Sequence, residues 1–503
     1  MPRPSTPDTE AAFAEELSAV RPGLSEPYAR ALPGARAAVL TRLWRALAYE
    51  PLPWIDRREA DREGLTLRLA DGRRLRGPLP DPYATSAYVT EVRLGERVYD
   101  RPEALVDALG VPHGGAFSAE LGNSVASLAL SRANRTSEDV PGASGASWAW
   151  EQRIVDGHPY HPNCRARPGF SVAEQLAYGP EHRTSVRLGL VAVDDALVTG
   201  EWPKWLRDGE RVLVPVHPWQ AAHVLDAPVQ EGFAARPLMS LRTLAVPDGT
   251  HVKTALSARL TSSVRDISVY SVRTADAVSA FMEETTARLG APLHITRTLG
   301  AATAGSPDLA AVVRESPDGY AGEGERCVPV AALPLTGLPG KASWLADLAR
   351  LVLTVGLRLL ELGVALEAHG QNLLVILDRA GSPVRLVYRD LADIRVSPAR
   401  LALHGVPVPE LSGRIVTDDV RALRRKLFGS LVGGALGATA GSAAALREAL
   451  ASVAPDLPRT PDLPALLGEP VPAKALTLMR LSPGTPGNLW TRLPGPLAGP
   501  GSS

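Results

Sequence analysis

The sequence is poor in cysteine and has no excess charge of either sign. Only two of its 503 residues are cysteines, Cys164 and Cys327, and no CxxC pair occurs. This excludes a disulfide framework and a cysteine-based zinc site, and we expect a reducing, cytoplasmic location. Lysine plus arginine equals aspartate plus glutamate at 54 each. The net charge therefore gives no reason to expect nucleic acid or an anionic membrane as a partner, although a local basic pocket for a small polyanion stays open.

Long apolar runs are also scarce. Residues 1–10 hold prolines and acids but no apolar segment, so we expect no secretory signal. Residues 427–446 carry no charge, and glycine recurs every four residues from Gly429 to Gly441. A membrane dimerisation helix has this spacing, but glycine, alanine, serine and threonine gain little in lipid. We therefore predict a soluble helix, or a loop followed by a helix, with close backbone packing and no membrane partner.

The chain is long enough for two to four domains, and its patterns change twice. Residues 1–150 are mixed and helix-rich, and Asp71 and Gly72 mark a hairpin between alternating strands. Residues 151–338 hold short β-like runs punctuated by proline and glycine. Residues 339–503 are mainly helical, with one hairpin over 373–388. The sequence predicts an α+β fold with a β-rich middle domain and a helical C-terminal domain.

Two His-Pro pairs and two arginines crowd residues 157–171, GHPYHPNCRARPGFS. Prolines hold their neighbours extended, so His158 and His161 can be fixed beside the guanidinium of Arg165. These groups suit a carboxylate or a phosphate; the alternative is an ordinary polar turn. A third His-Pro pair follows an apolar strand at His217. A structural role is favoured there, because a buried imidazole commonly closes a backbone hydrogen bond.

Cationic and hydroxyl side chains gather in residues 251–268, HVKTALSARLTSSVRDIS. Strand alternation puts Lys253 on one face, and the turn that follows brings Thr261, Ser262 and Arg265 to a polar edge. Cations neutralise a triphosphate, and hydroxyl groups orient it. The alternative is a solvated strand face.

A polar loop at residues 366–377, LEAHGQNLLVIL, is followed by a hairpin strand at 385–394, RLVYRDLADI. The loop carries Glu367, His369 and Asn372, and the hairpin returns Asp390 towards it. The layout resembles the catalytic loop and metal-binding aspartate of protein kinases, where oxygen ligands hold magnesium on phosphates. The alternative is a capped helix end with an ion pair.

Taken in order, these segments resemble the NRPS-independent siderophore (NIS) synthetases, the aerobactin-synthetase-like family. The resemblance rests on AELGNSVASLAL, GHPYHPNCRARPGFS, VPVHPWQ, SLRTL, KTALSARLTSSVRDI, EAHGQNLL with YRDL, and AKALTLMRL. It implies a cupped hand of thumb (1–150), fingers (151–338) and palm (339–503), and a homodimer. It also implies a cytoplasmic ligase that uses ATP and magnesium to adenylate citrate or a related polycarboxylic acid. The acid is then joined to an amine or an alcohol in siderophore biosynthesis.

The resemblance implies roles for single residues as well. The residues matched to catalysis are His161, Lys253, Arg265 and His369. Those matched to nucleotide binding are Ser240, Arg242, Lys253, Thr261, Ser262, Arg265, His369, Asn372 and Asp390. Those matched to the acid are His158, His161, Arg165, Arg242 and Thr261, and the implied magnesium ligands are Glu367, Asn372 and Asp390. Arg165 stands where the family usually has lysine. The arginine keeps the positive charge but holds an anion with a planar, bidentate group instead of a single ammonium.

Two other functions stay open at this stage. The layout of Asn372 and Asp390 suits a kinase-like phosphotransferase, and a non-catalytic nucleotide-binding relative would keep the same pocket. Acid-dependent formation of AMP favours the synthetase, ADP favours the kinase-like enzyme, and neither product favours the non-catalytic binder.

Overall fold

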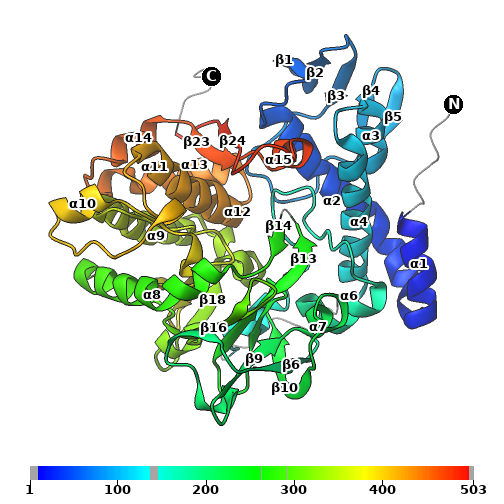
Figure 1. The fold of residues 1–503 in the computed structure, drawn as a ribbon. Coiled ribbons are helices and arrows are strands. Elements are labelled where there is room, and N and C mark those ends of the chain that lie inside the picture. Colours follow the sequence, from blue (N-terminus) through cyan, green and yellow to red (C-terminus); the bar gives the residue numbers. More distant parts are fainter. Residues whose placement is uncertain (1–8, 136–144, 262, 291, 498–503) are drawn as a thin grey trace.

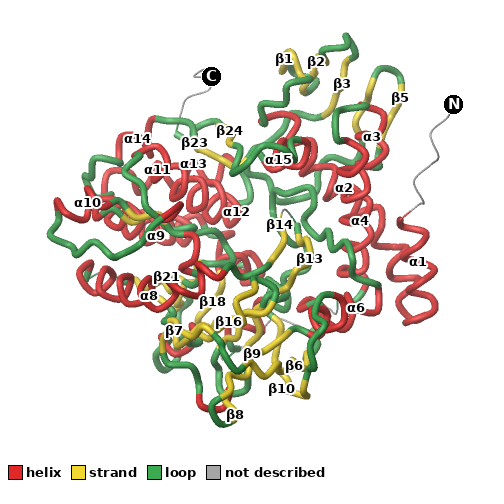
Figure 2. Tube along the Cα trace, viewed as in Figure 1, coloured by secondary structure: helices red, strands yellow, loops and turns green. Residues whose placement is uncertain are grey.

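The computed structural model describes residues 9–135, 145–261, 263–290 and 292–497 (Figure 1). Its helices and strands form a mixed α+β fold, as the sequence predicts. The N-terminal helices form one side of the molecule, the large sheet lies below the centre, and the C-terminal helices form the opposite side (Figure 2).

The N-terminal part packs helices on one face of a five-stranded antiparallel sheet in the order β1-β2-β3-β4-β5. The helices are α1 (Thr9–Val20), α2 (Ser25–Tyr49), α3 (Pro102–Leu109) and α4 (Gly114–Ala133). The strands are β1 (Ile55–Ala60), β2 (Leu65–Leu69), β3 (Arg74–Gly77), β4 (Val92–Leu94) and β5 (Arg97–Tyr99). The predicted hairpin is β2–β3, and its turn contains Gly72 with a φ of 86°. Leu67 and Leu75 are paired across it and fully buried towards the helices.

The middle part is a nine-stranded sheet in the order β7-β16-β17-β12-β11-β10-β6-β9-β8, and its pairs are antiparallel. Strands β17 and β12 also contact β9 in the other half of the sheet, so the sheet curls on itself. The strands are β6 (Val186–Val193), β7 (Leu197–Gly200), β8 (Arg207–Asp208), β9 (Arg211–Val216), β10 (Gln230–Pro237), β11 (Thr243–Ala245), β12 (His251–Thr254), β16 (Thr298–Ser306) and β17 (Leu309–Arg314). A separate hairpin consists of β13 (Leu256–Leu260) and β14 (Ser263–Arg265).

The helices of the middle part include one that the sequence patterns do not predict. Short helices are α5 (Ser147–Glu151), α6 (Val172–Tyr178) and α7 (Pro218–His223). The unexpected one is α8 (Val269–Leu289), a 21-residue helix inside the β-rich region. Ser268 caps its first turn, and Gly290 ends it in a left-handed conformation. Phe281 and Met282 on this helix are buried in the C-terminal core, so packing supports a helix where strands were expected.

The C-terminal part packs helices against a four-stranded sheet in the order β15-β21-β20-β18. Its helices are α9 (Ala342–Leu362), α10 (Pro398–Leu403), α11 (Val420–Phe428), α12 (Gly437–Ala440), α13 (Ala443–Val453), α14 (Leu463–Gly468) and α15 (Leu476–Leu481). Its strands are β15 (Leu293–Ile295), β18 (Arg326–Pro329), β19 (Val364–Ala365), β20 (Leu373–Leu377), β21 (Pro383–Tyr388), β22 (Arg395–Val396), β23 (Val471–Lys474) and β24 (Trp490–Leu493). The predicted hairpin is β20–β21. The hairpin β23–β24 replaces the helix expected near the end of the chain.

Three apolar cores correspond in part to the predicted division into residues 1–150, 151–338 and 339–503. Some elements cross the second boundary, because β15 and β18 pair with the C-terminal strands β21 and β20. Helix α15 returns from the C-terminal part to contact α2 and α4 (Figure 1). The domain boundaries themselves stay a prediction.

The charge-free segment at 427–446 is largely buried, with close backbone contacts as predicted. It continues α11 through a π-helix, Gly429–Leu436, into α12. A Cβ added at Gly437 would lie 2.6 Å from the ring of Tyr83, so only glycine fits there without movement. Among the described helices, none alone is long and apolar enough to cross a membrane. One pair, Val420–Ala440 with Ala443–Asp456, passes that test together but is bent by 115° at the break.

Candidate active site

Lys253 and Asp390 form the centre of the candidate site. Lys253 lies on β12, and its Nζ donates a hydrogen bond to Asp390 Oδ1 at 2.6 Å. Asp390 follows β21 with a φ of 71°, a conformation that residues other than glycine rarely adopt and that often marks functional sites. The curled sheet and the β20–β21 hairpin therefore meet at this ion pair.

Three arginines, Arg242, Arg265 and Arg314, act electrostatically on the carboxylate of this pair. Burial alone would raise the pKa of Asp390, but the charges of Lys253 and Arg314 outweigh it and hold this pKa well below its usual range. Burial lowers the pKa of Lys253 to about 8, although Asp390 acts in the opposite direction. Burial also lowers the pKa of both Arg242 and Arg314 to about 10. Four cations thus act on the carboxylate of Asp390. Asp266, Glu151 and Glu367 each act on one of the arginines as well.

The cluster keeps contact with solvent. The side chain of Asp390 is 30% exposed, and Arg242 and Arg265 are partly exposed although burial dominates the pKa of both arginines. His158 is likewise exposed to solvent, yet the protein around its ring holds its pKa well below the usual value, with burial as the largest cause. A ligand from solvent can therefore reach Asp390, Arg242 and Arg265 directly.

The loop between β19 and β20 brings a second set of charges to the site. Glu367 Oε1 lies 2.8 Å from Lys474 Nζ and 3.3 Å from Lys426 Nζ. Asn372 Nδ2 donates to the backbone oxygen of Glu367 at 3.2 Å, which closes the loop. Burial lowers the pKa of His369, while Glu367 and the central carboxylate act in the opposite direction. The loop therefore lies beside the central pair, as the sequence predicts.

The three His-Pro pairs fold in the same way. The Nδ1 atoms of His158, His161 and His217 accept hydrogen bonds from the backbone N–H two residues later, at 3.2, 3.0 and 3.1 Å. An acceptor nitrogen in a neutral imidazole leaves the proton on the other nitrogen, so each ring presents an Nε2–H donor. Burial, reinforced by Arg480 and Arg265, lowers the pKa of His161 to about 3. Its Nε2 has no hydrogen-bond partner among the described residues.

Two predicted hydroxyl residues lie in turns beside the cluster. Ser240 Oγ accepts a hydrogen bond from Thr243 N at 3.2 Å, which shapes the turn that carries Arg242. Thr261 has a φ of 58°, and its backbone N–H donates to Ala166 O at 3.4 Å. This contact links the β13–β14 hairpin to the His-Pro segment.

Three other predicted or considered residues stand apart. The guanidinium of Arg165 is buried; it donates to Val155 O at 2.7 Å and pairs with Glu181 Oε2 at 3.3 Å. These contacts hold backbone and a buried carboxylate, so they are structural. His217 is fully buried and caps α7, the structural role that the sequence favours. Ser262 lies outside the described residues.

Several cations of the site were not singled out from the sequence. They are Arg314 on β17, Lys426 on α11, Lys474 on β23 and Arg480 on α15. Arg480 Nε donates to Glu120 Oε2 at 2.8 Å, and its charge reaches His161. The sequence offers one signal for such residues: Arg314 is a charge at the end of an apolar run. That signal does not reveal which distant residue the charge will lie beside.

The predicted magnesium ligands fit the ion only in part. Glu367 is held by two lysines, and no group of three or more His, Cys, Asp or Glu side chains gathers for a metal in the described ranges. Asp390 uses Oδ1 for Lys253, and no hydrogen bond engages its Oδ2 within the described part of the chain. One carboxylate oxygen suits an ion that takes its other ligands from phosphates and water.

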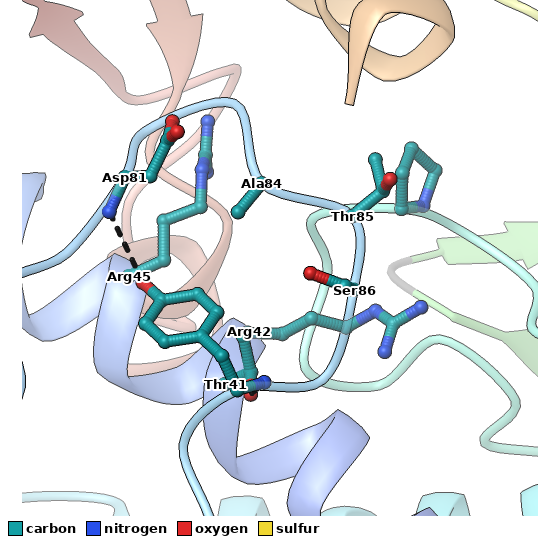
Figure 3. Close-up of a pocket in the computed structure, with 9 residues that line it drawn as sticks. Thr41, Arg42, Arg45, Asp81, Ala84, Thr85 and Ser86 are labelled. Atoms are coloured by element: carbon teal, nitrogen blue, oxygen red, sulfur yellow. Dashed lines mark hydrogen bonds between the residues drawn. The ribbon is translucent and has the colours of Figure 1, made fainter. Parts of the chain in front are cut away.

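Two hollows lie away from this cluster. The cavity in Figure 3, about 10 Å³, is lined by Thr41, Arg42, Arg45, Asp81, Ala84, Thr85, Ser86, Tyr88 and Pro159. It has room for about one water molecule. An open groove of about 320 Å³ is lined by Pro292, Asp347, Arg350, Leu351, Thr354, Val355, Ser382 and Pro383. Neither hollow contains a residue of the central cluster. The candidate site is therefore identified by its buried charges and not by a cavity.

Two segments of the chain match known family models, and the cluster takes Lys253 from the first segment and Asp390 from the second. Residues 146–334 match the model of the IucA / IucC family, and residues 342–485 match a model described as ferric iron reductase FhuF-like transporter. The chain is 28% identical over 309 residues to the citryl-spermidine/3,4-dihydroxybenzoyl-citryl-spermidine:spermidine ligase of Bacillus anthracis, a match that covers 48% of this chain and 50% of the relative. This chain spans about half the length of the curated relatives that it matches.

Solved structures are similar over nearly the whole chain. The petrobactin biosynthesis protein AsbB of Bacillus anthracis str. Sterne has a TM-score of 0.74 at 19% identity, with 98% of both chains covered. The ATP-bound aerobactin synthetase IucA of Klebsiella pneumoniae has a TM-score of 0.68 at 20% identity, covering 92% of this chain and 99% of that one. At such identities the likeness shows the fold.

Proposed function

We propose that this chain is a member of the IucA/IucC family of NIS synthetases and an ATP-dependent ligase of siderophore biosynthesis, which the match of residues 146–334 to that family's model supports. It adenylates a carboxylate of citrate or a related polycarboxylic acid and joins the acyl group to an amine or an alcohol. The relative from Bacillus anthracis, whose name refers to citryl-spermidine and spermidine, supports this choice of acid and nucleophile.

The observation that carries the proposal is the group of four cations that act on the carboxylate of Asp390. Arg242, Lys253, Arg265 and Arg314 act on Asp390, whose side chain is 30% exposed to solvent. Buried cations are costly unless anions bind them. A triphosphate and a polycarboxylate together supply such anions. Lys253 and Asp390 also come from the two separately matched segments, so both segments serve one site.

In the first step, a carboxylate oxygen of the acid attacks the α-phosphorus of ATP. The bond to the oxygen that bridges the α- and β-phosphates breaks, and pyrophosphate leaves. Two unit charges 4 Å apart repel each other by about 4 kcal/mol at an effective dielectric constant near 20. Arg242, Lys253 and Arg265 offset this repulsion and stabilise the charge that develops on the phosphate.

In the second step, the amine nitrogen attacks the acyl carbon, AMP leaves, and the amine loses a proton to solvent. Positioning supplies most of this step. His158 and His161 present Nε2–H groups, which suit the free carboxylates of the acid. Because Nε2 of His161 already carries a proton, this imidazole acts as a donor that holds the acid.

The nucleotide end of the site consists of the loop that carries Glu367, His369 and Asn372, together with the turns at Ser240 and Thr261. Asp390 Oδ2 would hold a magnesium ion, which when bound neutralises phosphate charge. Asn372 lies in the loop that carries Glu367 and donates a hydrogen bond to the Glu367 backbone oxygen. The ion pairs of Glu367 with Lys426 and Lys474 hold this loop in place. Arg165 is assigned a structural role, since its guanidinium is engaged by Glu181 and backbone oxygens.

The finer features that the family implies belong to the same proposal. They are the thumb, fingers and palm of a cupped hand, a homodimer, and a cytoplasmic location. Cys164 and Cys327 are buried free thiols, which supports a reducing compartment.

The proposal is tested by incubating the full chain with ATP, magnesium, hydroxylamine and one acid at a time from citrate, succinate and α-ketoglutarate. We expect an acyl hydroxamate that depends on both ATP and the acid, with citrate giving the most. No hydroxamate with any acid of a broad panel, from protein that binds ATP, would contradict the ligase. The layout of Asn372 and Asp390 makes a kinase-like phosphotransferase the second candidate, which forms ADP instead.

A further inference from the structure

Glu151 is a fully buried carboxylate behind the cluster that no step above uses. It ends α5 and is 0% exposed. Its Oε1 lies 2.7 Å from Arg389 Nη1, and its Oε2 accepts a hydrogen bond from Met239 N at 3.0 Å. Arg389 precedes Asp390, and Met239 lies in the turn that carries Arg242. One side chain therefore joins the two segments that build the central cluster.

Arg389 extends this contact to the nucleotide-side loop. Its Nε and Nη2 both donate to Gln371 O, at 3.0 and 2.8 Å, and its backbone N–H donates to Asn372 O at 3.0 Å. The residue is 3% exposed, so its charge depends on Glu151 for compensation. Removing one partner of a buried ion pair typically costs about 3–5 kcal/mol, because the other charge is left buried and unpaired.

The short helix that carries Glu151 is itself firmly anchored. Ser147 donates to Asp318 through its backbone N–H at 2.9 Å and its hydroxyl at 3.0 Å. Gln152 Nε2 donates to Pro237 O at 3.2 Å, and Trp150 is buried in the C-terminal core. A carboxylate on such a support can fix the position of its partners.

We propose that Glu151 is a positioning residue for the nucleotide. It acts through Arg389 and the Met239 turn, which set Asp390 and the loop at 367–372 against Arg242 and Lys253. The inference rests on the proposed function, because ATP is the ligand that this arrangement would hold. Glu151 itself is buried behind these residues and does not touch ATP.

The test compares Glu151→Gln with the wild-type chain. Glutamine keeps the size and the acceptor for Met239 N but removes the charge. We expect the KM for ATP and the dissociation constant of a non-hydrolysable ATP analogue, measured by calorimetry, to rise about tenfold or more. The KM for the acid should change less than about twofold. In Arg389→Gln the ATP effect should be similar, and the double variant should be no weaker than Arg389→Gln alone, because both changes break one contact.

The matched control is Asp462→Asn. Asp462 is also 0% exposed and lies between two arginines, 2.6 Å from Arg400 Nη1 and 2.8 Å from Arg424 Nε. Its variant should lose thermal stability as Glu151→Gln does, but keep the wild-type affinity for the ATP analogue. Glu151→Asp keeps the charge at a shorter reach, so its ATP affinity should lie between those of Glu151→Gln and the wild type.

Three results would overturn the inference. One is normal affinity for the ATP analogue in folded Glu151→Gln, or in Glu151→Asp if the glutamine variant does not fold. Another is a double variant whose loss is the product of the two single losses. The last is an equal loss of ATP affinity in Asp462→Asn. Because analogue binding needs no turnover, these results are distinct from a wild-type chain that binds the analogue but forms no hydroxamate, which would contradict the proposed function instead.

Discussion

The ammonium of Lys253 lies 2.6 Å from the carboxylate of Asp390, although 137 residues separate them in the sequence. Lys253 belongs to the segment that matches the IucA / IucC model, and Asp390 belongs to the segment matched by the second model. Neither segment alone holds both charges. The contact therefore makes the two halves one site, and the predictions below follow from the charges around it.

Lys253 should impose a pH limit on nucleotide binding. Burial lowers its pKa to about 8, so the ammonium loses its proton as the pH rises through about 8 in the nucleotide-free protein. Since kcat/KM reports ionisations of the free enzyme, kcat/KM for ATP should fall about tenfold per pH unit above that point. The neutral amine no longer offsets phosphate charge.

The control for this limit is Lys253→Arg, whose guanidinium stays charged, so its normalised profile should lack the alkaline fall. Between about pH 8 and the unfolded lysine value near 10.4, the folded state binds fewer protons than the unfolded state. This group therefore makes the free energy of unfolding rise with pH in that window. An alkaline fall of the same midpoint in both proteins would show that another group is responsible.

Arg265→Ala should damage the chemistry without unfolding the protein. Arg265 is partly exposed, and its guanidinium donates a hydrogen bond to Leu260 O at 3.4 Å. Removing one preorganised donor to a developing charge costs about 2–4 kcal/mol of transition-state stabilisation, or about 30- to 1,000-fold in kcat/KM. The measurement is kcat/KM for ATP at saturating acid, with thermal unfolding as the control. Near-normal turnover by the folded variant would refute this role.

His161→Asn should weaken the binding of the acid and leave the binding of ATP unchanged. Asparagine can still accept the backbone hydrogen bond at the turn, but it loses the Nε2–H donor. A hydrogen bond to a charged group contributes about 1.5–3 kcal/mol, so the KM for citrate should rise about 10- to 100-fold while the KM for ATP stays the same. The matched control is His217→Asn, which changes the same His-Pro turn away from the cluster. Equal effects of the two variants on citrate would contradict the assignment.

The protonation state of His161 can be measured separately. Burial and three arginines lower its pKa to about 3, so its imidazole should stay neutral between about pH 5 and about pH 8. Histidine signals followed by NMR should show no titration of this ring in that window, with the proton on Nε2. A His161 transition near the unperturbed value of about 6.5 would contradict the donor role.

Gly433 in the π-helix and Gly437 at the start of α12 offer a matched test of packing. A Cβ at Gly437 would lie 2.6 Å from Tyr83 Cδ1, whereas one at Gly433 would lie 3.5 Å from Val471 Cγ1. Gly437→Ala should therefore lower the free energy of unfolding by about 1–3 kcal/mol through overpacking. Gly433→Ala should leave it unchanged or raise it by up to about 1 kcal/mol, the helix propensity of alanine over glycine. Chemical denaturation measures both, and equal stabilities would contradict the close packing.

Much of the fold could be predicted because periodic patterns determine it. The apolar period of α9 and the paired runs of β20 and β21 predict a helix and a hairpin, and both are present. The helix α8 and the hairpin β23–β24 were not predicted, because each differs from the overall pattern of its surroundings. Helix α8 lies in a β-rich region, and β23–β24 lies in a mainly helical one. Their local signals, such as the cap at Ser268 and the short alternation at Val471, are weak beside the neighbouring segments.

The candidate site could be predicted only where polar residues cluster in the sequence. Lys253, Arg265, His369 and Asp390 come together as predicted, because each lies in a polar segment between apolar runs. Glu151 is a single acidic residue that follows Trp148 and Trp150, and no spacing connects it to Arg389. Long-range contacts of this kind depend on tertiary packing. The His-Pro pairs predicted rigid imidazoles, but the direction of the donors required the structure.

The central claim, that ATP is split at the α-phosphate by a carboxylate oxygen, is tested most directly with an acid labelled with ¹⁸O in its carboxylates. Citrate, or the acid that gives the most hydroxamate, is turned over with ATP, magnesium and hydroxylamine, and the products are followed by ³¹P NMR. We predict AMP and pyrophosphate, with one ¹⁸O transferred from the acid to the phosphate of AMP. ADP as the acid-dependent product, with ¹⁸O in inorganic phosphate and none in AMP, would contradict adenylation and favour the kinase-like phosphotransferase.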